Sequence, residues 1–167
     1  LRNCSASQAA DILKDLKLDN DTIYRVRILV EWQGKKVGFQ DGMEDGMRDV
    51  IKDGREPSRA SIRRAMSQME PELFDDFLRV KLCLAEECPP AAECLRALCS
   101  LRDEIRRDGD CISLKMLAVT GNDLIKAGMK PGKEVGTRLQ QFLELVLEDP
   151  VRNTKEYLLS LLSSVSD

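Results

Sequence analysis

Apolar residues recur every three or four positions along most of the chain, a spacing typical of amphipathic helices. The first such segment runs from Ser5 to Leu16, and no useful length of sequence alternates between apolar and polar residues as a strand does. Capping residues, prolines and glycines set the limits of the other expected helices. These helices lie at residues 20–32, 57–69, 71–86, 91–107, 113–118 and 120–127, from Pro131 through Leu147, and after Asn153.

Several helix starts carry residues that commonly accept a hydrogen bond from the first free backbone N–H groups. Asn20 or Asp21 is expected to cap the second helix. Thr120 with Asp123 three residues later has the pattern of a capping box. Asn153, with Glu156 at the third position, is expected to cap the last helix.

The pattern therefore predicts an all-α fold, an elongated bundle of about eight helices. We expect a helical body over residues 1–109 and a helical tail over residues 110–167. Composition agrees, because 43% of residues are hydrophobic and only 4% aromatic, so Leu, Ile, Val and Met must fill the core. The chain begins with Leu1, and we expect it to be a piece of a longer protein.

Composition also argues against several classes of function. The chain has no histidine, the commonest general base, and its six cysteines form no CxxC pair. No P-loop, GxGxxG or paired aspartates after a Gly-Ser turn are present, so we expect no catalytic residue and no metal ligand. No apolar run approaches the roughly 20 residues of a membrane span, and no signal peptide is recognisable, so we expect a cytoplasmic protein with no membrane contact.

One basic region stands out in a chain of net charge −3. From Lys115 to Arg138 there are five cations and two acids, a net charge of +3. Pro131 and Gly132 should leave the next helix with a bare N-terminus, whose free N–H groups favour phosphate. The expected RNA-contacting residues are Lys126, Lys130, Gly132, Lys133 and Arg138. The alternative is an ordinary helix-turn-helix corner with solvated lysines. Gly136 is expected to permit close approach of another helix.

A second basic cluster consists of Arg55, Arg59, Arg63 and Arg64. Arg59, Arg63 and Arg64 form a second candidate RNA-binding patch. The same arginines could equally pair with Glu56, Glu70 and the acidic helix that follows Pro71.

The region from Leu117 to Leu159 resembles the tail of bacterial CCA-adding tRNA nucleotidyltransferases. The resemblance rests on a Gly-x-Asp-Leu turn, a Pro-Gly helix start, a leucine-rich helix and an Asn-Thr cap. These stand at Gly121-Asp123-Leu124, Pro131-Gly132, Leu139 to Leu147 and Asn153-Thr154. More weakly, residues 16–32 are similar to a helix of the family's HD-like portion, and residues 61–82 to the body helices.

The resemblance implies a fragment that binds tRNA for a catalytic head. That head and the HD-type metal residues are missing here, so no cofactor is expected in this fragment. Mg²⁺ and CTP or ATP are expected to bind only where the head is present. In such enzymes an EDxxR motif reads nucleotide bases. The match at Glu44 to Arg48 lies in a Gly-rich stretch, an expected loop with one short helix at residues 43–52, and we interpret it as chance.

Two alternatives remain open from the sequence. The chain could be a degenerate HD-like helical domain that acts only in protein contacts or as a homodimer. It could also be a whole enzyme that uses the EDxxR motif.

Overall fold

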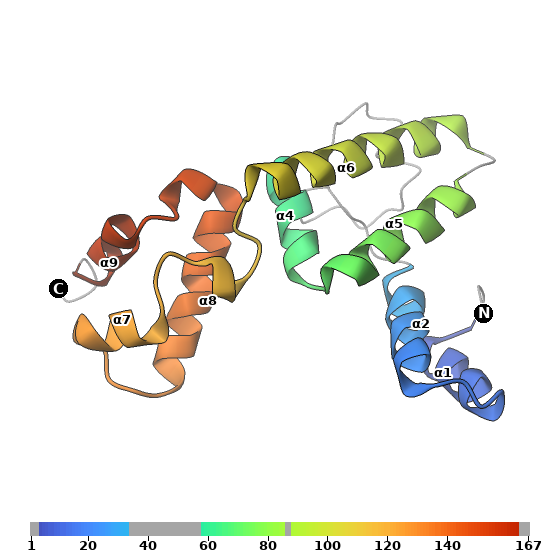
Figure 1. Ribbon diagram of the computed structural model, residues 1–167, viewed down its shortest axis with the longest axis horizontal. Helices are drawn as coiled ribbons and strands as arrows, with labels where there is room; N and C mark the ends of the chain where they lie inside the picture. The colour runs from blue at the N-terminus through green and yellow to red at the C-terminus, as the bar shows by residue number, and fades with distance from the viewer. Residues whose placement is uncertain (1–3, 34–57, 86–87, 164–167) are drawn as a thin grey trace. The chain divides into compact units, whose positions relative to one another are not determined.

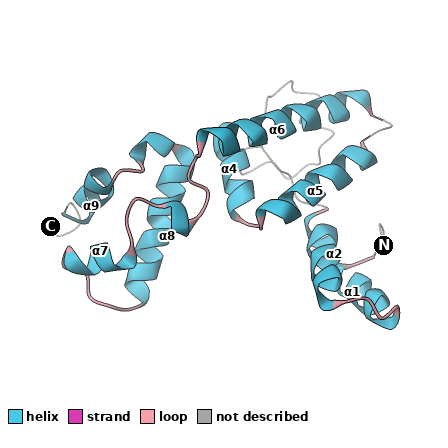
Figure 2. Cartoon of the chain, in the orientation of Figure 1, coloured by secondary structure: helices cyan, strands magenta, loops and turns pink. Residues whose placement is uncertain are grey.

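The structure, a computed structural model, describes residues 4–33, 58–85 and 88–163 (Figure 1). Within these ranges the chain has eight α-helices, two 3₁₀-helices and no strand, which confirms the predicted all-α fold (Figure 2). The loop and short helix expected over residues 34–54, and the EDxxR motif with them, lie outside the described residues. Among the described helices, none has the length and apolar character needed to cross a membrane.

The helix bounds follow the sequence pattern with small shifts at the ends. The elements are α1 (Ala6–Asp15), α2 (Asn20–Trp32), α4 (Arg59–Ser67), α5 (Pro71–Leu84), α6 (Pro89–Asp108), η1 (Leu114–Met116), α7 (Gly121–Lys126), α8 (Lys133–Glu148), η2 (Pro150–Arg152) and α9 (Lys155–Ser163).

The chain divides into two compact units, and α6 contributes residues to both. One unit comprises residues 1–58 and 69–100, and the other comprises residues 59–68 and 101–167. The short helix α4 is thus grouped with the C-terminal unit although α5 separates them in the sequence. The expected boundary between body and tail at residues 109 and 110 stays a prediction.

The first unit contains a helical hairpin and a small aromatic contact. Ala10 and Leu13 of α1 pack with Ile23 of α2 in a buried cluster. At the far end of α2, the ring of Trp32 meets that of Phe77 on α5 edge to face, with centroids 6.1 Å apart. Such pairs bury large apolar area with a specific geometry, so they fix α2 against α5.

The second unit is built around α8. The spacing of its apolar residues predicts one stripe along this helix, and the stripe residues Val135, Phe142, Leu143, Val146 and Leu147 are buried. They share one core with residues from every neighbouring segment, namely Cys111, Leu117, Val119, Leu124 and Leu158. Because this core joins α7, α8 and α9, it sets the position of every basic residue predicted in the tail.

Two predicted helix starts are wrong by one or two residues. Asp19, not Asn20 or Asp21, caps α2, since its Oδ1 accepts from the N–H of Thr22 at 2.9 Å. The helix expected to start at Pro131 begins at Lys133, with Gly132 as the cap residue. Asp19, Asn20 and Asp21 are all suitable caps, so the local sequence does not decide between them. At α8, the non-helical backbone of Gly132 delays the start of the helix.

Candidate nucleic-acid interface

The turn between α7 and α8 is fixed by hydrogen bonds that the sequence predicts. Thr120 and Asp123 form the expected capping box at the start of α7. At the other end, Gly128 has φ +104° and the N–H of Met129 donates to the carbonyl of Leu124 at 3.0 Å. This is a Schellman ending, in which a glycine in the left-handed region stops the helix. The chain therefore leaves α7 in one defined direction.

The N-terminus of α8 lacks a side-chain cap. Its cap residue, Gly132, has φ +153° and ψ −167° and offers no side chain to accept from the first N–H groups. Free N–H groups and the positive end of the helix dipole make such a site favourable for an anion. The bare helix start expected from Pro131 and Gly132 is thus present, two residues later than predicted.

Three lysines of the predicted site lie on this turn. Lys126 ends α7, Lys130 lies in the connection and Lys133 is the first residue of α8, and all three are exposed. Among the residues that the structure describes, none of the three has a hydrogen-bond or ion-pair partner for its ammonium group. Their charge is therefore available to a ligand.

One of the two acids in this basic region, Asp123, is already neutralised. One oxygen of Asp123 accepts from Lys155 on α9 at 2.6 Å, and the other accepts from the backbone N–H and hydroxyl of Thr120. The ion pair with Lys155 and the bonds from Thr120 hold the pKa of Asp123 well below its ordinary value of 3.8. Glu134, in the first turn of α8, is the remaining acid of the region.

Arg138 is separate from the three lysines. Five residues after Lys133, it lies about 7 Å further along α8 and on another side of the helix. It lines a groove of about 610 Å³ whose walls come from α4, α8, η2 and α9. The structure therefore divides the predicted tail site into a turn with three lysines, here called the lysine turn (Lys126, Lys130, Lys133), and a groove.

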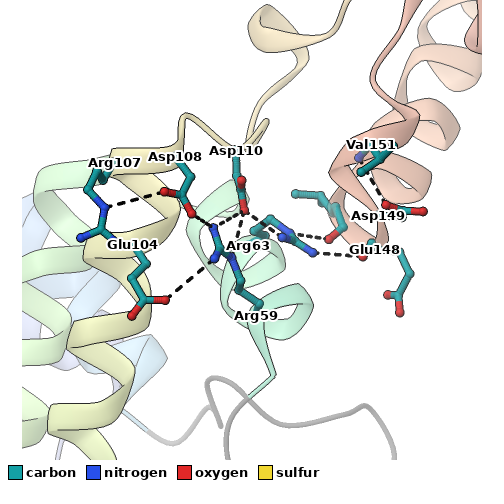
Figure 3. A network of polar contacts seen from close by, with 10 residues as sticks. Arg59, Arg63, Glu104, Arg107, Asp108, Asp110, Glu148, Asp149 and Val151 are labelled. Carbon is teal, nitrogen blue, oxygen red and sulfur yellow. Dashed lines mark hydrogen bonds and ion pairs between the residues drawn. The ribbon is translucent and has the colours of Figure 1, made fainter.

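The second basic cluster has a different environment, shown in Figure 3. Asp110 is its centre, because one carboxylate oxygen accepts from Arg63 at 2.8 Å and from Arg59 at 3.2 Å. Arg59 also pairs with Asp108 at 2.5 Å, which raises the pKa of Arg59 and lowers that of Asp108. A Schellman ending at Gly109, φ +70°, places Asp110 just beyond α6.

Arg63 also closes the C-terminus of α8. It is 5% exposed and donates to the carbonyl oxygens of Leu147 and Glu148 at 2.7 and 3.0 Å. Arg64 beside it pairs with the carboxylate of Glu148 at 2.7 Å. The last turn of α8 has no basic residue of its own, so these arginines supply the cations that its free carbonyls and negative dipole end favour. We call Arg59, Arg63 and Arg64 the arginine cluster.

The arginine partners differ from those proposed from the sequence. Within the described residues, the acidic partners are Glu104, Asp108, Asp110, Glu144 and Glu148 rather than Glu70 or the acidic helix after Pro71. Arg55 and Glu56 lie outside the described residues. An RNA-binding role for the arginine cluster stays a prediction, but its charges already have acidic or carbonyl partners.

The sequence prediction missed Thr154 as the cap of α9 and assigned the wrong roles to Asn153 and Gly136. The side chain of Asn153, expected to cap α9, instead accepts from the N–H of Ala118 at 2.8 Å and donates to the carbonyl of Met116. The hydroxyl of Thr154 accepts from the start of α9. Gly136 has no atom within 4 Å of an added Cβ, so the expected close approach there is wrong. The close approach occurs at Gly121, where an added Cβ would lie 3.2 Å from Cγ1 of Val135.

Metal-binding geometry is not found in the part of the chain that the structure describes. No group of three or more Cys, Asp or Glu side chains there is arranged to hold an ion. The cysteines of the described residues form no disulfide with one another, and burial raises the pKa of Cys94 and Cys111.

Comparison with known proteins gives one match. The family model described as tRNA nucleotidyltransferase domain 2 matches residues 64–162, which is more than half of the chain. The matched region begins within α4 and includes the lysine turn, the groove and most of α9. Searches of curated proteins and of solved structures give no match.

Proposed function

The chain belongs to the tRNA nucleotidyltransferase domain 2 family, and from that premise we propose that it is the tRNA-binding part of a CCA-adding nucleotidyltransferase. In this proposal it holds tRNA while another part of the parent protein adds nucleotides to the 3′ end. We propose a cytoplasmic location for it, as befits a tRNA partner.

The observation that carries the proposal is the lysine turn. Lys126, Lys130 and Lys133 stand exposed beside the uncapped N-terminus of α8, with no acidic partner among the described residues. Lysine ammonium groups and free backbone N–H groups are the donors that most often bind nucleic-acid phosphates. Because such contacts release counterions, they supply most of the sequence-independent affinity for RNA.

The same proposal assigns no nucleotide transfer to this chain. The sequence has no paired aspartates of the kind that hold two metal ions for phosphoryl transfer. We therefore expect Mg²⁺, CTP and ATP to be used by a catalytic head elsewhere in the parent protein. An incorporation assay with tRNA, CTP, ATP and Mg²⁺ tests this, and labelled tRNA product from the chain alone would contradict it.

The binding experiment is a charge reversal at the turn. We expect Lys130→Glu with Lys133→Glu to weaken tRNA binding and to flatten its dependence on salt. Both residues are exposed, so the circular dichroism spectrum and melting temperature should stay close to those of the unchanged chain. Unchanged tRNA affinity at low salt would remove the lysine turn from the binding site.

A second candidate function rests on a different surface. Ile12, Leu16 and Leu18, at the α1–α2 hairpin, are 45, 65 and 42% exposed. Clustered exposed apolar residues mark protein contacts, so this hairpin fits a homodimer or another protein partner. Size exclusion with light scattering, together with a gel shift with tRNA, separates the two candidate functions. A monomer that shifts tRNA supports RNA binding, and a stable dimer that does not bind tRNA supports protein contact.

A further inference from the structure

The groove beside α8 has the dimensions and walls of a ligand site. One helical stripe of α8, with residues three and four positions apart, lines the groove: Arg138, Gln141, Phe142, Leu145 and Glu148. Leu161 of α9 lies among the other lining residues. The stripe from Arg138 to Glu148 is about 15 Å long, and the volume of about 610 Å³ lies within the usual range of small-ligand pockets.

Among the described residues that line the groove, one cation has no acidic partner. Arg64 pairs with Glu148 at 2.7 Å and with Glu144 at 3.5 Å, so one guanidinium is shared between these two carboxylates. Arg152 pairs with Asp149 at 3.1 Å. Arg138 has no ion-pair or hydrogen-bond partner among the described residues, although it is half-buried. A guanidinium in this position favours an anionic ligand.

We infer that this groove binds an unpaired nucleotide of the RNA that the lysine turn holds, an inference that rests on the proposed function. Leu145 and Leu161, both half-buried, give the apolar surface on which the face of a base can pack. The exposed amide of Gln141 can donate to and accept from a base edge. Arg138 would bind the adjoining phosphate or stack on the base.

The choice of RNA over a protein segment follows from size and position. A docked protein helix needs several apolar contacts in successive turns, whereas the apolar lining here amounts to Phe142, Leu145 and Leu161, with Phe142 almost fully buried. The groove also begins at Arg138, little more than one helical turn from Lys133, so one RNA strand can reach both.

The test compares two single-stranded ribonucleotide hexamers with equal numbers of phosphates. One carries all its bases and the other lacks the central two. We expect the unchanged chain to bind the complete hexamer about tenfold more tightly in fluorescence anisotropy, because each stacked base contributes measurably to affinity. Leu145→Gln should bring this ratio close to one, and Arg138→Gln should lower it.

Matched variants separate the groove from its surroundings. Leu84→Gln, at an exposed leucine at the end of α5, should leave the ratio unchanged. Lys130→Glu with Lys133→Glu should weaken both hexamers alike and keep the ratio. Melting temperatures identify any variant that does not fold, and Arg138→Gln keeps the test valid if Leu145→Gln unfolds.

The outcomes distinguish this inference from the proposal on which it rests. If the chain binds tRNA but has equal affinity for both hexamers, the proposed nucleotide site in the groove is wrong and the tRNA-binding proposal stands. The groove would then be a site for a protein partner. A ratio that survives both groove variants would do the same. Failure to bind either hexamer or tRNA would overturn both proposals together.

Discussion

The two ends of α8 both meet basic side chains, but in opposite ways. At its C-terminus, Arg63 and Arg64 reach across from α4 and bind the last carbonyls and Glu148. At its N-terminus, Lys130 and Lys133 are exposed to solvent, and the cap residue Gly132 has no side chain to accept from the first N–H groups. Lysines at the positive end of a helix dipole are mildly unfavourable, whereas arginines at the negative end are favourable.

The cations of the arginine cluster therefore stabilise the fold, whereas the cations of the lysine turn are available to bind a ligand. The arginine cluster lowers the free energy of its own helix end, so its charge is already used within the protein. The lysine turn instead concentrates positive charge where the fold gains nothing from it. A bound phosphate would supply the anion that both the lysines and the helix dipole favour. Substitutions at either end of α8 therefore test this difference between the two basic clusters.

The largest expected effect is at Arg63. Replacing Arg63 by Met removes a buried guanidinium, leaves two helix carbonyls without their donor and leaves Asp110 with Arg59 alone. Breaking a buried charged contact by removing one partner typically costs about 3–5 kcal/mol. We expect a loss of this size in the free energy of unfolding, measured by urea denaturation with circular dichroism.

Its matched control is the next residue on α4. Arg64 pairs only at the surface, with its side chain 37% exposed. Exposed ion pairs contribute at most about 1 kcal/mol, so Arg64→Met should shift the unfolding midpoint little. Equal losses of unfolding free energy for Arg63→Met and Arg64→Met would contradict the claim that burial makes the Arg63 contacts the stronger ones.

A smaller effect is expected at the glycines around the lysine turn. Gly132 has a backbone conformation that is almost confined to glycine, so Gly132→Ala should cost roughly 1–3 kcal/mol and weaken tRNA binding. Gly136 lies within α8 with open space around it, so Gly136→Ala should stabilise the chain by about 0.5–1 kcal/mol and leave binding unchanged. Thermal melts and gel shifts of both variants check the pair; a harmless Gly132→Ala would contradict the account of the turn.

The smallest effect concerns Asp123 and is best seen as a pH dependence. Lys155 and Thr120 lower the pKa of Asp123 in the folded chain below its ordinary value of 3.8. A carboxylate with a lowered pKa stabilises the fold fully above the unfolded value and loses that contribution as pH falls towards the folded value. Asp123→Asn should therefore lower the melting temperature at pH 7, with the gap to the unchanged chain closing below about pH 4. A gap independent of pH would contradict the Lys155 pair.

Much of the fold follows from local sequence. The stripe on α8, the capping box at Thr120 and the glycine endings of α6 and α7 depend on residues a few positions apart, and the sequence predicts them. The choice of Asp19 was missed because its two neighbours are equally suitable caps. The late start of α8 was missed because Gly132 adopts a non-helical backbone conformation that the spacing does not reveal.

The long-range contacts could not be predicted in this way. Arg63 meets Asp110 across 47 positions and Leu147 across 84, and Lys155 meets Asp123 across 32. Neither spacing nor composition links such residues, because only the packing of α4 and α9 against α8 brings them together. Consequently both basic clusters look alike in the sequence, and only their partners in the structure tell them apart.

The most direct test of this contrast is the salt dependence of tRNA affinity in two double variants. Removing one phosphate-binding cation should reduce the slope of log K against log salt by about 1. We predict that Lys130→Gln with Lys133→Gln reduces the slope by roughly 2, while Arg59→Gln with Arg64→Gln leaves it unchanged in chains shown to be folded. The reverse result, with the arginine variant flattening the slope and the lysine variant not, would contradict the assignment of the two clusters.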